Sequence, residues 1–443
     1  MERRHFLRAG LPASAGVLMA STPARAVPTN NLSRRITVTH FGAEGNGSTD
    51  DTSAIQSACN ALEDEGCLYF PVGKYRVTKP ITLPPRMNVQ VIGDGPASIL
   101  YADAPMSELL RIWRPFHGSI IEQLSLNANN QADTALRLLG GTYVRLTGLD
   151  ISNPRNLGIH CGETDDSISS GVDLIISDCR LSGLEQPMPS NVDSKTTDGS
   201  HMGILVEKGY SFGYFNNVII RGFVHTGMEL RGDENIMHEV HIYRFPAVQF
   251  EMALCLHGRH SYVAQCSFDN FANTGIEVLG NNTTIETCYF KRWSAAFGSG
   301  KVSPGDAIRL GDDNYPVENI NIQGNSFYSE MPDDPLYANT TMTAVRNKNA
   351  RRISSEHNQY IAVNKNDHII PGDTAISGAI VIPKGKKGTT VPHGLIATPQ
   401  QVHLTPASRL DGAEYWVDDI NGKEFSISLS QSSKQPVKFY WRI

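Results

Sequence analysis

Charged residues recur at one place in a repeated pattern of short apolar runs. In each run one variable residue lies between apolar neighbours, and strand alternation turns that residue outward while its neighbours point inward. The outward residues are Arg137, His160, Leu205, Glu229, Gln249, Glu277, Arg309 and Arg346. Two positions further along, the same face carries Glu207, Arg231 and Glu251 in three successive repeats. The pattern indicates either a reactive face or a solvated face whose charges pair across repeats.

Two of these carboxylates have a spacing that suits acid–base chemistry. Glu229 and Glu251 lie one repeat apart and two residues out of step, so we expect their Cα atoms ~8 Å apart. A protonated carboxyl and a carboxylate separated by roughly 6.5 to 9.5 Å leave room for a water between them. Arg231, expected between Glu207 and Glu251, would keep one carboxylate ionised, whereas Glu229, with less compensation, would keep a raised pKa.

The candidate residues fall into two groups. The catalytic candidates are Glu229, Glu251, Glu207 and Asp233. The candidates for binding a substrate are Arg231, Glu277, Arg309, His160, Asp198 and His201. Asp198 and His201 belong to a long connection, and Asp233 follows a strand, so each also fits an ordinary polar residue of a turn or loop.

The elements that would position these residues are short strands that return at intervals of roughly 20 to 35 residues, a signature of solenoids. Three connections that precede the outward residues are long: Gly183 to Met202, Lys291 to Asp306, and Tyr328 to Met342. All three leave at the same corner, and inserted loops on one face of a repeat protein commonly build its binding face. We expect them to wall a trough whose floor carries Glu207, Glu229, Arg231, Glu251 and Glu277.

An inward column is expected opposite the charged face. It contains Leu149, Cys179, Phe223, Phe245, Cys266, Cys288 and Asn325. We interpret these cysteines as small apolar core residues. A disulfide between Cys59 and Cys67 is an alternative without further support. The sequence has no closely spaced Cys and His set, so we predict no metal site of that kind.

Charge and the N-terminus limit the other roles. The net charge is -6 over 443 residues, which gives no support for nucleic-acid binding. Residues 1–26, with Arg3-Arg4 and a final Ala24-Arg25-Ala26, are typical of a twin-arginine signal peptide. We therefore predict export to the periplasm or the exterior. No later run reaches the ~18 apolar residues of a membrane span.

The N-terminal region resembles a known family. FGAEGNGSTDDTSAIQSACNAL from Phe41, LYFPVGKYRV from Leu68, and the runs at residues 81–83 and 91–95 are similar to the N-terminal part of the pectate lyase superfamily. That group includes polygalacturonase-like and rhamnogalacturonase-like proteins and phage tailspikes. The resemblance implies a right-handed parallel β-helix and a carbohydrate-directed role, and it carries over no catalytic residue.

The predicted fold class is therefore all-β. We expect a parallel β-helix at residues 36–362 with a short N-terminal capping helix, a linker at 363–378, and a small β-sandwich domain at 379–443. The last domain contains alternating runs such as Glu424 to Leu429. It would cap the solenoid, bind glycan or hold subunits together, and a homo-oligomer is compatible with the sequence.

Three functions fit these observations. The first is hydrolysis of a polysaccharide or oligosaccharide by a carboxylate pair, without a cofactor. The second is a lyase acting on a uronate polymer, with Arg231, Arg309, Lys208 or His160 as base or charge neutraliser and calcium at Asp312-Asp313 or Asp165-Asp166. The third is a non-catalytic glycan-binding or tailspike-like protein. The charged rather than aromatic outward column favours an enzyme.

Overall fold

The structure is a computed structural model of the chain. It describes residues 34–165, 168–183, 201–243, 252–269, 271, 273–291, 305–328, 343–361, 377–393, 398–399 and 401–443. The expected signal peptide lies outside these residues. So do Asp198, Phe245, Gln249 and Glu251, which the sequence had placed in the core or at the site.

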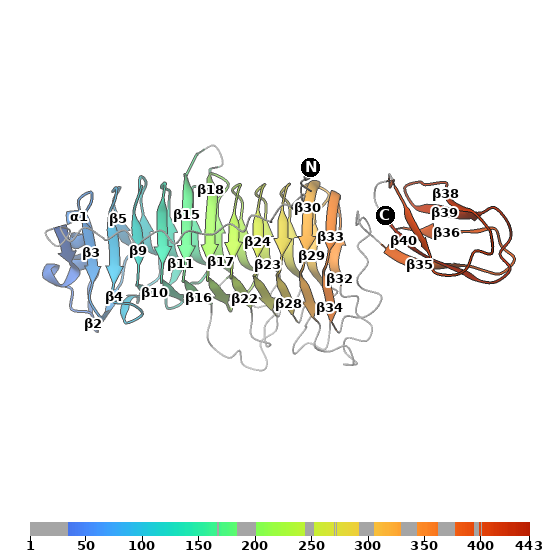
Figure 1. The fold of residues 1–443 in the computed structure, drawn as a ribbon. Coiled ribbons are helices and arrows are strands. Elements are labelled where there is room, and N and C mark those ends of the chain that lie inside the picture. The colour runs from blue at the N-terminus through green and yellow to red at the C-terminus, as the bar shows by residue number, and fades with distance from the viewer. Residues whose placement is uncertain are drawn as a thin grey trace, which may run out of the picture. The chain divides into compact units, whose positions relative to one another are not determined.

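Residues 35–361 form a right-handed parallel β-helix in which successive coils stack along one axis (Figure 1). A complete coil contributes one strand to each of three parallel sheets, called here the first, second and third sheets. Each strand pairs in parallel with the strands of the coils before and after it. The predicted fold class is confirmed.

The strands of the first sheet are β1 (Arg35–Thr37), β3 (Cys67–Phe70), β6 (Gln90–Gly93), β9 (Ile120–Glu122), β12 (Val144–Thr147), β15 (Gly171–Ser177), β18 (Tyr210–Asn216), β21 (Ile236–His238), β24 (Tyr262–Ala264), β27 (Thr284–Glu286), β30 (Val317–Gln323) and β33 (Ala350–Glu356). Those of the second sheet are β2 (Asn46–Asp50), β4 (Gly73–Val77), β7 (Ser98–Ala102), β10 (Ser125–Asn127), β13 (Asp150–Ser152), β16 (Arg180–Ser182), β19 (Ile219–Arg221), β22 (His241–Tyr243), β25 (Ser267–Asp269), β28 (Tyr289–Lys291), β31 (Ser326–Tyr328) and β34 (Gln359–Ile361).

The third sheet carries the predicted outward column. Its strands are β5 (Ile81–Leu83), β8 (Met106–Ile112), β11 (Ala132–Leu138), β14 (Leu157–Cys161), β17 (Met202–Val206), β20 (Thr226–Leu230), β23 (Met252–Leu256), β26 (Thr274–Val278), β29 (Asp306–Leu310) and β32 (Thr343–Asn347).

The sequence pattern showed two strands in each repeat, whereas the structure has three. The runs at residues 218–220 and 240–242 resemble Val144 to Leu146 of the first sheet, but their strands, β19 and β22, belong to the second sheet. The reason is a one-residue bend between these two sheets. Asn217 and Glu239 turn the chain there with positive φ angles of 50° and 54°. A bend this short leaves no turn signal in the sequence.

The buried residue that follows each bend forms the inward column. Its members are Leu124, Leu149, Cys179, Val218, Val240, Cys266, Cys288 and Asn325. The three cysteines are buried as predicted, but Val218 and Val240 occupy the places assigned to Phe223 and Phe245. The cysteines of the chain are all free, so Cys59 and Cys67 form no disulfide.

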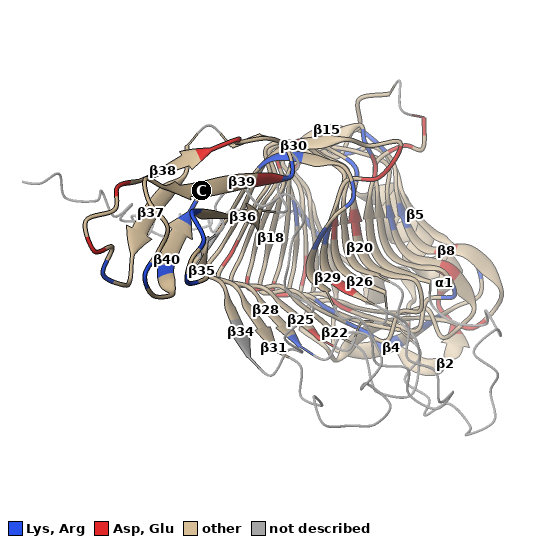
Figure 2. Ribbon diagram, turned by 90° about the vertical axis from the view of Figure 1, so that its right-hand side faces the viewer, with Lys and Arg blue, Asp and Glu red and all other residues tan. Residues whose placement is uncertain are grey.

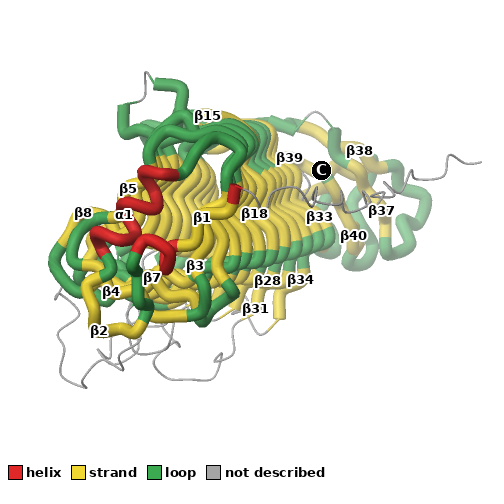
Figure 3. The backbone as a smooth tube through the Cα atoms, turned by 90° about the vertical axis from the view of Figure 1, so that its left-hand side faces the viewer, coloured by secondary structure: helices red, strands yellow, loops and turns green. Residues whose placement is uncertain are grey.

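A short N-terminal helix closes the first coil, as predicted. The 3-10 helix η2 (Val38–Phe41) is followed by β2 and then by α1 (Thr52–Ala61), which lies across the end of the coil stack in Figure 3. Ile55, Ala58 and Cys59 are fully buried and join the same hydrophobic core as the strands. No described helix is long and apolar enough to cross a membrane.

The C-terminal strands form two antiparallel sheets. The first contains β35 (Ser377–Ile382), β40 (Val437–Arg442) and β37 (His403–Pro406), and the second β36 (Gly388–Pro392), β39 (Glu424–Leu429) and β38 (Tyr415–Asp418). Side chains from both sheets share one core that includes Phe425, Ile427 and Phe439. β35 is absent from the predicted strands.

Aromatic stacking inside the coils contributes to the stability of the β-helix. The ring of Phe290 is stacked between those of Phe268 and Phe327, with centroid distances of 5.2 and 5.0 Å. We expect Phe290→Ala to lower the free energy of unfolding by about 3 to 5 kcal/mol, because it leaves a cavity between two rings. Phe41→Ala, the same change at a side chain that is 39% exposed, is the control. Equal losses of unfolding free energy for the two variants in urea denaturation would contradict this prediction.

Candidate functional site

The outward column of the third sheet is continuous through ten coils. By strand register it consists of Thr82, Arg111, Arg137, His160, Leu205, Glu229, Cys255, Glu277, Arg309 and Arg346. The column contains every predicted residue except Gln249, for which β23 contributes Cys255, and it extends beyond the prediction to Arg111 and Thr82. Residues 247–250, predicted as the strand of that coil, lie outside the described residues and have the same apolar–variable–apolar pattern as β23. Figure 2 shows acidic and basic segments together along the face that carries β20, β26 and β29.

A chain of polar contacts crosses the coils at the ends of β14, β17, β20 and β23. The buried carboxylate of Glu207 lies 2.8 Å from His160 Nε2 and accepts a hydrogen bond of 2.8 Å from Arg231 Nη1. Arg231 Nε donates to Glu229 Oε1 at 2.7 Å. His257 Nε2 lies 3.3 Å from the same Glu229 oxygen. We call these five side chains the central cluster.

His257 occupies the place that the sequence assigned to Glu251. It follows Leu256 as Arg231 follows Leu230, and those two leucines are paired in register. Arg231 bridges Glu207 and Glu229. Glu251 itself lies outside the described residues, so its expected pairing with Glu229 stays a prediction.

Both carboxylates of the central cluster are held in the ionised form. Burial raises the pKa of Glu229, but hydrogen bonds from His257 and Arg231 and the charge of Arg231 outweigh it, so the pKa lies below its ordinary value. Burial likewise raises the pKa of Glu207, and the contacts with His160 and Arg231 lower it further than burial raises it. The expected raised pKa of Glu229 is therefore wrong, because Arg231 turns toward Glu229 as well as Glu207.

The exposed fractions separate the roles of these side chains. The side chain of Glu207 is 3% exposed and that of Glu229 14%, whereas Arg231 is 40% and His257 27% exposed. A ligand on the third sheet would meet Arg231, His257 and the edge of Glu229. Glu207 lies beneath them and fixes the positions of His160 and Arg231.

A second group of charges follows on the next coils. Glu277 lies two strands beyond Glu229 in the same column, with the nearly buried Cys255 between them. Glu277 pairs with Arg309 at 3.4 Å. A hollow of about 640 Å³ opens beside it. Its lining residues are Glu277, Asp306, Arg309, Asp312, Asp313, Arg346 and Lys348.

Two other predicted site residues have local partners. The carboxylate of Asp233 binds Arg259 Nη2 at 2.6 Å, and that contact lowers its pKa despite partial burial. The ring of His201 stacks on that of His225 at a centroid distance of 4.9 Å. Burial and the neighbouring His225 lower the pKa of His201. Neither residue contacts the central cluster among the described residues.

The sequence analysis missed His257, Cys255 and Asp306. A correct strand assignment for β23 would have placed the first two, because they take the positions of Arg231 and Glu229 in their coil. Asp306 gave no such signal, since it lies at the start of β29, outside the alternating pattern.

The long connections lie at one corner, as predicted. Each of the three runs from a strand of the second sheet to a strand of the third: β16 to β17, β28 to β29 and β31 to β32. The connection from β22 to β23 is a fourth. All four precede strands that carry the charged column, and their residues lie largely outside the described part of the chain.

Metal ligation was considered at Asp312. Its Oδ1 accepts hydrogen bonds of 2.7 Å from the backbone N–H groups of Asn314 and Tyr315, as in an ordinary polar turn. In the described ranges no group of three or more His, Cys, Asp or Glu side chains has the arrangement of a metal site. Asp166, the partner of Asp165 in the other suggested calcium site, lies outside those ranges.

The family follows from a comparison with protein-family models. The model described as rhamnogalacturonase A/epimerase, pectate lyase-like matches residues 35–298. The chain belongs to this family. The match confirms the resemblance seen at the N-terminus, and it covers the coils of Glu229 and Glu277 but ends before β29. No curated protein matches the chain.

Solved structures with the same fold come from several kinds of protein. The A-module of mannuronan C-5 epimerase AlgE6 from Azotobacter vinelandii has a TM-score of 0.54 at 15% identity, over 75% of this chain and 95% of its own. The Dettilon tailspike protein gp208 has a TM-score of 0.52 at 12% identity, over 93% and 94%. ORF18 of Geobacillus virus E2 has 0.50 at 15% identity, over 90% and 76%. At these identities the likeness shows the fold alone.

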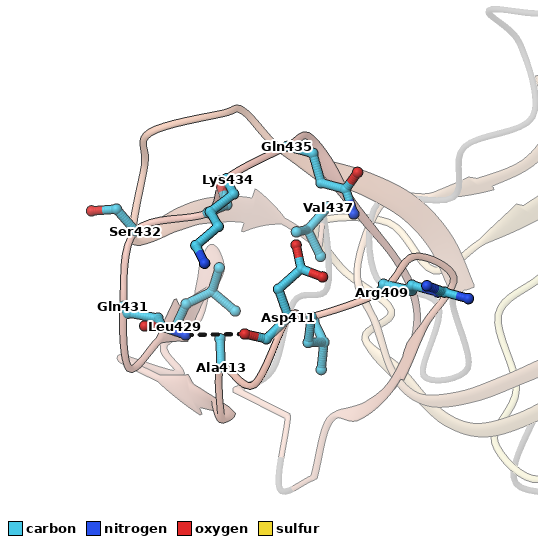
Figure 4. Close-up of a pocket in the computed structure, with 11 residues that line it drawn as sticks. Arg409, Asp411, Ala413, Leu429, Gln431, Ser432, Lys434, Gln435 and Val437 are labelled. Carbon is cyan, nitrogen blue, oxygen red and sulfur yellow. Dashed lines mark hydrogen bonds between the residues drawn. The ribbon is translucent and has the colours of Figure 1, made fainter.

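This family member also has a hollow in its C-terminal sheets, between the β37–β38 and β39–β40 connections (Figure 4). Asp411 and Lys434 line it, and Gln431 Nε2 donates to the carbonyl oxygen of Asp411 at 3.4 Å. Its volume is about 10 Å³. Since a single water needs about that much space, the hollow is too small for a sugar.

The lowered pKa of Glu207 predicts a pH-dependent stability. The carboxylate of Glu207 binds a proton less readily in the folded protein than in the unfolded chain. Glu207 therefore stabilises the fold at pH values above the ordinary carboxyl pKa of 4.5. That contribution is lost as the pH falls through the folded pKa. We expect the wild-type protein to have a larger free energy of unfolding than Glu207→Gln at neutral pH. This difference in unfolding free energy should narrow below about pH 4.5.

Denaturant unfolding between about pH 3 and pH 7 measures this margin. The matched control is Glu122→Gln on β9, a half-exposed carboxylate of the first sheet, which should change stability little. A margin for Glu207→Gln that stays constant over the whole range would show that its charge is not held by His160 and Arg231.

Proposed function

We propose that this chain is an exported enzyme that hydrolyses glycosidic bonds of a polysaccharide on the outer face of the third sheet. The observation that carries the proposal is the order Glu229, Cys255, Glu277 in one outward column. Adjacent strands lie ~4.8 Å apart, so the two glutamates start ~9.6 Å apart. The residue between them, Cys255, has a short side chain.

This separation suits hydrolysis with inversion. Such enzymes place two carboxyl groups roughly 6.5 to 9.5 Å apart, with a water beside one and the leaving oxygen beside the other. We assign the role of base to Glu229, because Arg231 and His257 keep it ionised and so able to accept a proton. Glu277 then takes the role of proton donor that the sequence had given to Glu229. An ionised Glu229 also stabilises the positive charge that develops on the sugar ring.

The surrounding elements support a polysaccharide as the substrate. The connections before β17, β23, β29 and β32 join the second sheet to the strands that carry this column. Insertions at one corner of a solenoid commonly build its binding face. Family membership supports a carbohydrate-directed role. Export through the twin-arginine signal remains part of the proposal, since a polysaccharide substrate lies outside the cytoplasm.

A lyase is the second candidate, and one contact favours it. His257 lies 3.3 Å from Glu229, which would orient its ring. Arg231 beside it would neutralise the carboxylate of a uronate while His257 removes the adjacent proton. Against this, Glu207 and Glu229 already compensate the charge of Arg231.

The carboxylate pair gives a direct mutational prediction. We expect Glu229→Gln and Glu277→Gln each to lower the turnover rate by about 10²- to 10⁴-fold, the range for loss of a general acid or base. Circular dichroism should show both variants folded. Glu318→Gln on the first sheet is the control for a lost carboxylate. Unchanged turnover in either site variant would exclude the pair.

The products distinguish hydrolase from lyase. Incubation with acidic and neutral polysaccharides should release reducing ends without unsaturated, ultraviolet-absorbing products, because hydrolysis adds water and forms no double bond. Appearance of both signals, with loss of activity in His257→Gln, would establish the lyase instead. Neither signal on any polymer of the panel would support the glycan-binding or tailspike-like alternative.

A further inference from the structure

The hollow beside Glu277 extends the proposed cleavage site along the coil axis. It lies over β26, β29 and β32 and takes up about 640 Å³. Glu277 belongs both to this lining and to the proposed catalytic column. A polymer whose reacting bond lies between Glu229 and Glu277 would therefore place its next sugar in this hollow.

One buried carboxylate sets the geometry of the hollow. Asp306, with a side chain that is 3% exposed, accepts hydrogen bonds from Arg309 Nε at 2.9 Å and from Arg346 Nε at 2.5 Å. Arg309 also pairs with Glu277, and Arg346 Nη2 donates to Thr343. A carboxylate shared by two guanidinium groups fixes both planes, because each bond is charge-assisted and directional.

The ion pairs of Arg309 and Arg346 also remove most of the positive potential of the hollow. Four carboxylates of the lining face three cationic side chains, which leaves one negative charge. In the neighbouring central cluster, the carboxylates of Glu207 and Glu229 against the one guanidinium of Arg231 add another negative charge when Asp, Glu, Lys and Arg alone are counted. A chain with a carboxylate on every sugar would meet a floor of its own sign, so electrostatics disfavours a polyanion here.

The remaining polar atoms suit hydroxyl groups. Among the contacts in the described residues, Nη2 of Arg309 and Nη1 of Arg346 are not used, so both stay available as donors. Asp312, Asp313 and Lys348 add acceptors and a further donor at the rim. Sugar hydroxyls both donate and accept, whereas a uronate carboxylate only accepts.

We propose that this hollow is a subsite for an uncharged hexose unit and that the enzyme acts on a neutral polysaccharide. The subsite uses Arg309 and Arg346 as hydroxyl donors, with Asp306 as the residue that positions them. The assignment to a substrate chain rests on the proposed hydrolytic function, but binding in the hollow does not require turnover.

Affinity electrophoresis tests the subsite separately from catalysis. Glu229→Gln protein, used so that the polymers stay intact, is run through gels containing galactan, glucomannan, xyloglucan or dextran, and through gels containing polygalacturonate or alginate. We expect retardation by at least one neutral polymer, unchanged from about 20 mM to about 0.3 M salt, and none by the two uronates. The further change Arg346→Gln in the Glu229→Gln protein should weaken the retardation about tenfold, because it removes the guanidinium donor that Asp306 positions.

A charge variant tests the exclusion of uronates. Asp312→Asn with Asp313→Lys keeps the acceptor of the 312–315 turn and makes the hollow net positive. It should gain salt-sensitive retardation by polygalacturonate. Glu414→Gln with Glu424→Lys makes the same charge change at exposed positions of the C-terminal sheets and should gain none.

Three results would overturn the subsite. They are stronger retardation by a uronate than by every neutral polymer, no retardation by any polymer, and equal binding by the Arg346→Gln variant. Persistent turnover in Glu229→Gln together with neutral-polymer binding lost in Arg346→Gln would instead disprove the catalytic pair and leave the subsite in place.

Discussion

The backbone hydrogen bonds between successive coils are the constraint on which the rest of this structure depends. They hold each strand of the third sheet in parallel register with the next, so an outward side chain meets its counterpart ~4.8 Å away. The one-residue bends and the buried residue after each bend maintain that register on the opposite side. Without it, Glu229 and Glu277 would not share a column, and Arg231 would not reach two carboxylates in adjacent coils.

Fixed register means that charges in a column must be compensated by their neighbours. Like charges on adjacent strands are destabilising, and Arg309 and Arg346 are such a pair in register. Opposite charges beside the column compensate them. Arg231 lies against Glu207 and Glu229, and Asp306 lies against Arg309 and Arg346. Arg137, nearly buried further along, donates instead to the carbonyl oxygens of Leu138 and His160, and burial lowers its pKa. Of the carboxylates on this face, Glu207 and Glu229 are kept ionised by their contacts with Arg231 and the neighbouring histidines.

The sequence predicted the fold and most of the charged column because both follow from periodicity. Apolar alternation identifies a strand face, so His160, Glu229, Glu277 and Arg309 could be placed without coordinates. Periodicity does not identify which of two similar runs is the strand, so Cys255 and His257 were missed. Nor does it give side-chain direction. Arg231 was expected to leave Glu229 uncompensated, and only its conformation shows that Nε reaches that carboxylate.

The contacts around Glu207 and those around Asp306 have the same arrangement, and this limits where a ligand could approach the third sheet. Glu207 and Asp306 are each almost fully buried, and each holds two nitrogen-bearing side chains above it. Buried carboxylates are costly to desolvate unless such partners surround them, so each one locks its cluster in place. Rigid clusters cannot yield to a ligand. Between them the column carries Cys255, whose side chain is small, neutral and nearly buried. A sugar ring that reaches the sheet there has Glu229 on one side and Glu277 on the other.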